Sequence, residues 1–105
     1  MKQRNEEALV RQAQKYDEKA LTLLLTDYQE YLYQIAFLYC KNQQAALDAV
    51  SECVTKVYLN LPKLKHPNYF KTWMTRILIN EVLDDMRKRR NQVSYDHLKE
   101  MGYET

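Results

Sequence analysis

The chain has 105 residues, with 16 basic and 14 acidic side chains but only one glycine and two prolines. Such scarce turn residues exclude β-meanders and sandwiches, and they favour long helices with short connections. No apolar run approaches the ~18 residues that span a bilayer, and the N-terminus lacks the apolar stretch of a signal peptide. The sequence therefore predicts one all-α domain, a compact helical bundle of about four helices, located in the cytoplasm without membrane insertion.

Two helices are predicted before residue 41. The first covers residues 5–15, with Asn5 as its N-cap. Asp17 caps the second, which runs to Cys40. Apolar residues at helical spacing predict a stripe on the second helix that faces the core: Leu21, Leu24, Leu25, Tyr28, Leu32, Ile35, Ala36 and Tyr39.

A third helix is predicted at residues 44–61, capped by Asn42 and terminated by Pro62. Its polar side includes an i,i+4 pair between Glu52 and Lys56. Its apolar side is predicted to face the core and comprises Ala46, Leu47, Val50, Cys53, Val54, Val57, Tyr58 and Leu61.

A fourth helix is predicted at residues 69–91, after an ordered turn between Pro62 and Pro67. Its apolar residues surround most of its circumference, which is typical of a helix sandwiched between several neighbours. One narrow polar line remains, formed by Arg76, Asn80, Asp84 and Arg87. Residues 92–105 are polar and without period, and we expect them to form a mostly flexible linker.

Charge is distributed unevenly along the chain. Residues 1–52 carry six basic and eight acidic side chains, whereas residues 53–105 carry ten and six. No acidic residue lies between Cys53 and Arg76. This asymmetry favours two different partners, one of them polyanionic, although an ordinary solvated surface explains the charge alone equally well.

The residues expected of an enzyme are missing from the sequence. Adjacent carboxylates such as Asp84 and Asp85 point to different sides of a helix and make a poor acid–base pair. There is no glycine-rich phosphate loop, no nucleophile motif and no metal-spaced cluster. Cys40 and Cys53 lack ligand spacing, so both are predicted to be buried, reduced thiols. We expect no catalysis, no metal and no cofactor.

The most informative segment is a basic turn followed by the start of the fourth helix. Its lysines and Arg76 can neutralise phosphates without reading sequence, and its aromatic rings can stack on unpaired bases. This combination suits melted DNA better than an intact major groove. Phe70 and Trp73 lie at helical spacing, which is equally typical of core residues. The candidate residues are Lys63, Lys65, His66, Asn68, Tyr69, Lys71, Trp73, Arg76 and Asn80.

Three motifs in order resemble those of the extracytoplasmic-function (ECF) group of sigma factors, the smallest members of the sigma-70 family. The most specific is Phe70-x-Thr72-Trp73-Met74-x-Arg76-Ile77-x-x-Asn80, followed by Asp84-x-x-Arg87-Lys-Arg-Arg. Upstream of it, Asn42-x-x-x-Ala46-Leu-Asp48-Ala-Val50-Ser-Glu52 is similar to a second family motif. The opening motif of the family resembles the run from Leu9 to Leu21.

The resemblance implies a region 2 domain at residues 1–91, with two binding partners. The third helix would dock on the beta-prime clamp helices of RNA polymerase core, through Asp48, Ser51, Glu52 and Thr55. The turn and the fourth helix would recognise and melt the minus-ten promoter element, and would hold a flipped base of the non-template strand. That role falls to Lys63, Lys65, His66, Asn68, Tyr69, Lys71, Trp73, Arg76 and Asn80, with Arg87, Lys88, Arg89 and Arg90 along the backbone phosphates. For this last run, a solvated helix end that complements the dipole is an equally common explanation.

The sequence also departs from the family pattern. Tyr16 replaces a usual glycine, and Ser51 replaces a glutamine, which shortens one expected polymerase contact. A sigma factor of this group continues through a linker, here residues 92–105, into a region 4 that is absent before Thr105. A truncated chain and a degenerate factor both explain this absence.

Two other function classes remain open from the sequence. A helical protein-interaction module, such as a sigma decoy or a partner-sequestering subunit, would keep the acidic docking face without needing the basic turn. A regulator that binds double-stranded DNA would need a recognition helix with an exposed polar face. An anti-sigma protein is a common further partner in the family and would cover the same faces.

Overall fold

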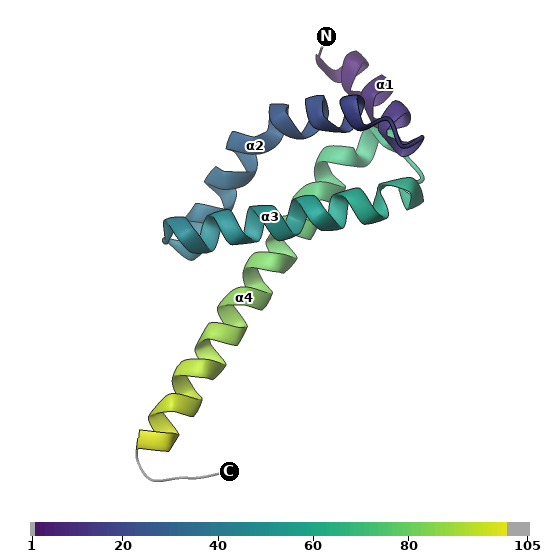
Figure 1. Ribbon diagram of the computed structural model, residues 1–105. Helices are drawn as coiled ribbons and strands as arrows, with labels where there is room; N and C mark the ends of the chain where they lie inside the picture. The colour runs from purple at the N-terminus through teal and green to yellow at the C-terminus, as the bar shows by residue number, and fades with distance from the viewer. Residues whose placement is uncertain (1, 101–105) are drawn as a thin grey trace.

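The computed structural model describes the backbone of residues 2–100 and the side chains of residues 6–90. Within that range the chain forms four α-helices, two short 3-10 turns and no strand (Figure 1). The predicted all-α bundle is therefore confirmed. In chain order, the elements are α1 (Lys2–Gln14), α2 (Glu18–Cys40), α3 (Gln43–Asn60), η1 (Leu61–Lys63), η2 (Pro67–Tyr69) and α4 (Phe70–Glu100).

Local capping chemistry sets where α2 and α3 begin. The Asp17 carboxylate accepts a hydrogen bond from the Ala20 amide at 3.1 Å, and the Asn42 side chain accepts one from the Ala45 amide at 2.8 Å. Both predicted N-caps are confirmed, since each satisfies an amide that the first turn leaves unpaired. The predicted cap at Asn5 is wrong, because α1 already begins at Lys2. Lysine, glutamine and arginine are good helix formers, so nothing local stops the helix at Asn5.

Helix α1 ends in a Schellman motif that places Tyr16 in the left-handed region. The Asp17 amide donates to the Gln12 carbonyl at 3.3 Å, and the Tyr16 amide donates to the Ala13 carbonyl at 3.0 Å. Tyr16 has a φ of 68°, where glycine is the preferred residue. Its side chain is 77% exposed, so packing does not compensate for the unfavourable backbone conformation.

We expect Tyr16→Gly to raise the free energy of unfolding by about 0.5–1 kcal/mol. Removing the β-carbon relieves the steric cost of the left-handed backbone conformation, about 1–2 kcal/mol. The flexibility of glycine in the unfolded chain offsets part of that gain. Urea unfolding followed by circular dichroism measures the change. The control is Lys19→Gly, an exposed helical position in α2, where glycine should lower stability by about 0.5–1 kcal/mol. A loss of stability in both variants would contradict the inferred backbone strain at Tyr16.

One hydrophobic core joins all four helices. Helix α4 contributes a stripe at four-residue spacing, Phe70, Met74, Leu78 and Val82, whose side chains are all fully buried. It packs against both α2 and α3, which also pack against each other (Figure 1). The other elements contribute to this core Val10, Ala13, Ala20, Leu24, Leu32, Ala36, Ala46, Ala49, Cys53, Val57 and Leu61.

Several residues predicted to face the core are exposed instead. Leu47 and Tyr58 of α3, and Tyr39 of α2, lie at the margins of their apolar stripes, where no neighbouring helix covers them. The predicted burial of both cysteines holds for Cys53, whereas Cys40 is only half-buried. The predicted polar line of α4, formed by Arg76, Asn80, Asp84 and Arg87, is exposed as expected. Leu83, one of the apolar residues predicted to surround the helix, is exposed beside it.

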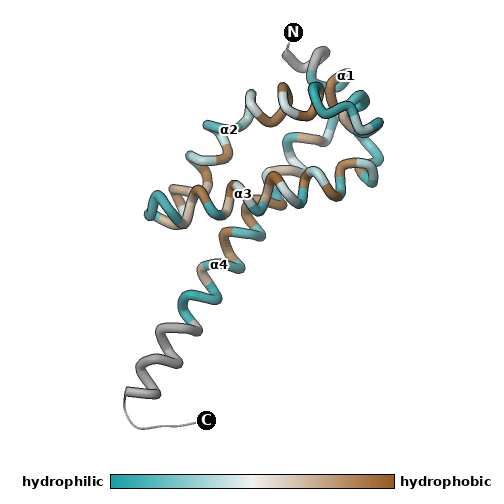
Figure 2. The backbone as a smooth tube through the Cα atoms, viewed as in Figure 1, coloured by the Kyte–Doolittle hydropathy of each residue, from teal (hydrophilic) through white to brown (hydrophobic). Residues whose placement is uncertain are grey.

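Helix α4 is longer than predicted at its C-terminal end. It runs to Glu100 rather than to residue 91, and its 31 residues span about 46 Å. The segment 92–100, predicted to be a flexible linker, is thus helical, while residues 101–105 lie outside the described range. No glycine or proline interrupts residues 91–100, and extending an existing helix is far easier than starting one. Figure 2 shows that the described part of α4 turns hydrophilic as it leaves the bundle.

Candidate functional site

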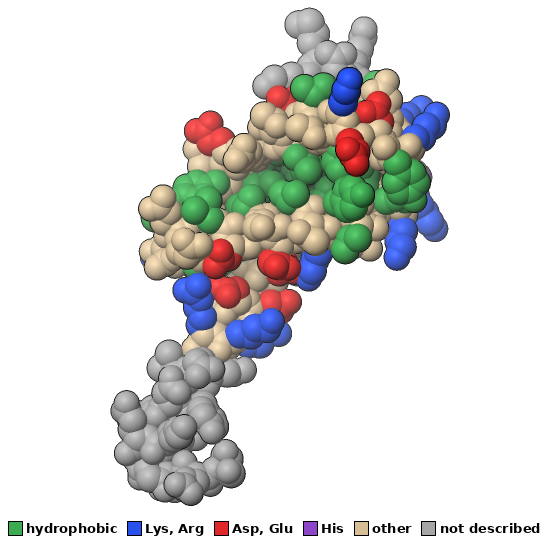
Figure 3. All heavy atoms as spheres, viewed as in Figure 1, with side chains coloured by type: hydrophobic (Ala, Val, Ile, Leu, Met, Phe, Trp, Pro, Cys, Tyr) green, Lys and Arg blue, Asp and Glu red, His purple; other side chains and the backbone are tan. Residues whose placement is uncertain are grey.

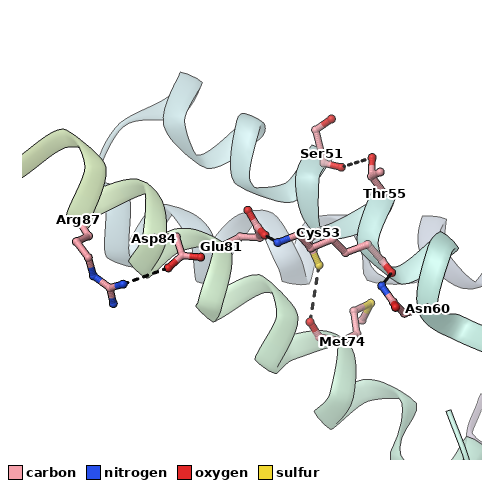
Figure 4. Close-up of polar contacts among 9 residues, drawn as sticks. Ser51, Cys53, Thr55, Asn60, Met74, Glu81, Asp84 and Arg87 are labelled. Carbon is pink, nitrogen blue, oxygen red and sulfur yellow. Dashed lines mark hydrogen bonds and ion pairs between the residues drawn. The ribbon is translucent and has the colours of Figure 1, made fainter. Parts of the chain in front are cut away.

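The first candidate surface is the polar face of α3. Its predicted docking residues Asp48, Ser51, Glu52 and Thr55 are all exposed, as a protein contact requires. The Thr55 hydroxyl donates to the Ser51 carbonyl at 3.1 Å (Figure 4). The Asp48 carboxylate accepts from the side-chain amide of Gln44 at 2.9 Å. Glu52 forms no ion pair with any side chain of residues 6–90. Its carboxylate is therefore available to a partner.

An interhelical ion pair ties α3 to α4 beside this face. Lys56 pairs with Glu81 of α4, so the predicted pair with Glu52 is wrong (Figure 4). The hydrogen bond with Glu81 raises the pKa of Lys56 and keeps its ammonium charged. The pair lies in a groove whose carboxylates outnumber its lysines, and Figure 3 shows acidic side chains gathered where α4 passes α3. The charged residues of this groove are Asp48, Glu52, Glu81, Asp84, Asp85, Lys56 and Lys88.

The second candidate surface is the basic turn between α3 and α4. Leu61 is buried and Leu64 packs against the core, which anchors the turn from within. The side-chain amide of Gln14 in α1 donates hydrogen bonds to the backbone carbonyls of Leu61 and Leu64, at 3.1 and 2.6 Å. Sequence reasoning missed this role of Gln14, because no local pattern links residues 47 and 50 positions apart. The anchored turn leaves the side chains of Lys63, Lys65 and His66 exposed.

Aromatic side chains of this surface differ in how accessible they are. Tyr69 is 58% exposed, with its ring edge-on to His66 at 6.0 Å between centroids. Phe70 is fully buried, and Trp73 is half-buried against it, with ring centroids 6.1 Å apart. Phe70 is therefore a core residue, whereas the Trp73 ring packs against the core on one side and is accessible on the other. Tyr69 is the best-placed ring for stacking.

Arg76 and Asn80 lie one turn apart on the exposed face of α4. Lys71 points to the opposite side of the helix, since nine residues rotate a side chain by about 180° relative to Asn80. Its ammonium lies 4.9 Å from the Tyr31 ring centroid, and it lines a groove with Asn68 and the carboxylates of Glu6, Glu7 and Asp27. The structure therefore groups Lys63, Lys65, His66 and Tyr69 in one turn and separates Lys71 from Asn80.

The basic run at residues 87–90 is partly neutralised by its own helix. Arg87 pairs with Asp84 at 3.6 Å, and Arg89 pairs with Asp85 at 3.0 Å. These residues lie about 16 Å along the helix axis from Arg76, taking the eleven positions at 1.5 Å each. The run is exposed, but its charge is weaker than its sequence indicates.

The described residues hold no group of three or more metal-binding side chains, and none of their helices is long and apolar enough to cross a membrane. Burial raises the pKa of the Cys53 thiol to about 12, and its Sγ lies 3.7 Å from the Met74 carbonyl (Figure 4). At neutral pH such a thiol stays protonated and is a poor nucleophile.

Fold and surface together define an all-α domain that presents an acidic helix face next to a basic, aromatic turn. A family model described as Sigma-70 region 2 matches residues 24–92, and the chain belongs to this family. The match contains α3, the basic turn and most of α4.

Named relatives agree with this assignment. RNA polymerase sigma factor SigV of Bacillus subtilis (strain 168) is 35% identical over 70 residues, which are 67% of this chain and 42% of that protein. ECF RNA polymerase sigma factor SigW of the same organism is 27% identical over 81 residues, 77% of this chain and 43% of the relative. ECF RNA polymerase sigma-E factor of Escherichia coli (strain K12) is 32% identical over 78 residues, 74% and 40% of the two chains. The chain thus spans about two fifths of the length of these curated relatives.

Proposed function

We propose that this chain is the core-binding and promoter-recognising domain of an ECF sigma factor. The exposed face of α3 docks on RNA polymerase core in the cytoplasm, and the basic turn with α4 binds the non-template strand of the minus-ten element. The observation that carries the proposal is the direct connection of the two surfaces. Helix α3 leads without a flexible linker into η1, and Gln14, Leu61 and Leu64 anchor that turn.

The side chains of the turn suit an opened strand. Lys63, Lys65 and Arg76 form no ion pair with residues 6–90, so they can neutralise phosphates without first losing a partner. Tyr69 offers a stacking surface, worth about 1–3 kcal/mol per base, and the half-buried Trp73 can close one side of a base site. Unstacking a base costs a few kcal/mol, which such contacts can offset.

The rival functions receive less support. A sequestering module needs the acidic face alone. It does not explain why an anchored turn exposes a tyrosine and two lysines that form no ion pair with residues 6–90, or why Arg76 of α4 is equally unpaired there. A regulator of double-stranded DNA needs a long polar face to enter the major groove. The exposed face of α4 instead carries Leu83, and two arginines of its basic run pair with Asp84 and Asp85.

Salt dependence tests the DNA surface. In complex with polymerase core, the affinity for a single-stranded minus-ten oligonucleotide should fall with salt, by a log–log slope of about −0.7 per phosphate contact. Replacing both Lys63 and Lys65 by alanine should flatten that slope by about 1.4. Lys19→Ala, which removes an exposed cation from α2, is the matched control. Equal slopes for all three proteins would remove this turn from the DNA interface.

Asn80→Ala tests base reading separately from phosphate binding. The Asn80 amide offers a donor and an acceptor and forms no hydrogen bond with the other side chains of residues 6–90. Its loss should reduce discrimination between cognate and substituted minus-ten strands by about 1–3 kcal/mol. Competition binding with a panel of substituted strands measures this. A uniform loss over all strands would identify Asn80 as a backbone contact.

A further inference from the structure

A small pocket lies where the end of α1, the start of α2 and the end of α3 meet. Leu21 and Leu61 contribute apolar surface to it, and the rings of Tyr16 and Tyr58 flank it. Asp17 and Glu18 also line it, together with Ala13 and Pro62, and the lining includes no lysine or arginine. None of the family motifs in the sequence explains why two tyrosines meet here.

Both tyrosines are held in exposed positions. Tyr16 is 77% and Tyr58 is 53% exposed, although either ring would gain stability by burial. Tyr16 additionally occupies the left-handed region, with a φ of 68°, at a helix end where glycine would be unstrained. Strained residues that packing does not require are concentrated at binding sites, and tyrosine is enriched in protein interfaces.

The pocket continues the polar face of α3. Tyr58 follows Ser51 and Thr55 by seven and three residues, so the three side chains share one side of the helix. Figure 3 shows a band of hydrophobic side chains that runs between α2 and α3 on this side of the molecule. A partner that covers Glu52 and Thr55 can therefore reach the pocket without leaving the surface.

Charge identifies the occupant. The Asp17 carboxylate already caps α2, but Glu18 forms no ion pair with residues 6–90. Aromatic faces beside a carboxylate are the surroundings that favour a cationic side chain. We propose that the pocket between Tyr16 and Tyr58 binds a lysine or arginine side chain of the polymerase core subunit that docks on α3. This inference rests on the proposed docking function, and it makes Tyr16 a docking residue.

The experiment measures the affinity of the full chain for RNA polymerase core, with unfolding curves recorded for each variant. Tyr16→Gly should weaken binding at least fivefold while leaving the protein as stable as the wild type or more so. Tyr16→Phe keeps the ring face and should bind within twofold of the wild type. Glu18→Lys should also weaken binding at least fivefold. The control is Leu23→Ala, which truncates an exposed side chain of the groove that contains Lys71.

The outcomes separate this inference from the docking function. Wild-type binding that is lost in Glu52→Lys but unchanged in Tyr16→Gly overturns the pocket and leaves the docking face standing. Equal losses in Tyr16→Phe and Tyr16→Gly overturn the contact with the ring face, and an equal loss in Leu23→Ala overturns its location. No wild-type binding to core overturns both proposals together.

Discussion

Glu52→Lys should weaken binding to RNA polymerase core by about two orders of magnitude, or ~2.7 kcal/mol, while leaving helicity and stability unchanged. Glu52 is exposed and central on the polar face of α3, and its carboxylate has no ion-pair partner among residues 6–90. Removing it therefore breaks no ion pair within residues 6–90. Placing a like charge against a basic partner costs several kcal/mol.

Co-purification of tagged core with the variant measures this effect, together with circular dichroism. Glu30→Lys is the matched control, because Glu30 is an exposed carboxylate of α2 whose one side-chain hydrogen bond within residues 6–90 is accepted from Gln34 of its own helix. Binding should persist in the control. If both variants bound core like the wild type, α3 would not be the docking helix, and the Lys56–Glu81 pair beside it would have a structural role alone.

Features encoded by neighbouring residues could be predicted from the sequence. Asp17 and Asn42 cap their helices because the side chain and the amides it satisfies lie three residues apart. Pro62 ends α3 within two residues of the predicted position for an equally local reason. The end of α4 could not be predicted in this way. Its last ten residues lack both an apolar period and a breaker, so the composition of a linker and that of a solvated helix look alike.

Contacts between distant residues could not be predicted. From the helical period alone, the Lys56 side chain could equally well pair with Glu52 or reach a neighbouring helix. Only the crossing of α3 and α4 makes Glu81 its partner. The same holds for Lys71, which sequence reasoning grouped with Arg76 and which the turn of the helix directs toward Tyr31. The exposure of the docking residues could be predicted, because the polar side of a clearly amphipathic helix points toward solvent.

The strength of the candidate site lies in how the basic turn is supported. A loop of lysines alone would be mobile, and ordering it on DNA would cost conformational entropy. Here Leu61 and Leu64 anchor the turn in the core, and the side chain of Gln14 in α1 donates hydrogen bonds to the carbonyls of the turn. Most of that entropy is lost on folding rather than on binding. Docking of α3 on polymerase would thus deliver a preorganised cationic surface to the strand.

Phe70→Ala should lower the free energy of unfolding by about 3–5 kcal/mol, the largest effect of any single substitution considered. Phe70 is fully buried where η2 meets α4, with its ring 6.0 Å from that of Tyr28 and 6.1 Å from that of Trp73. Truncation leaves a cavity under the basic turn that these neighbours cannot fill. Small domains are stable by only about 5–15 kcal/mol, so a large part of the population would unfold on mild warming.

Urea unfolding measures this loss, and the conservative variant Phe70→Leu should cost less than half as much because most of the volume remains. The two variants also separate packing from DNA contact. A fully buried ring cannot stack on a base, so Phe70→Leu should bind the minus-ten strand with nearly wild-type affinity whenever it is folded. Weak binding by a fully folded Phe70→Leu protein would mean that the ring becomes exposed when the strand binds. The core at the start of α4 would then open as part of promoter recognition, and Trp73, which packs against Phe70, would move with it.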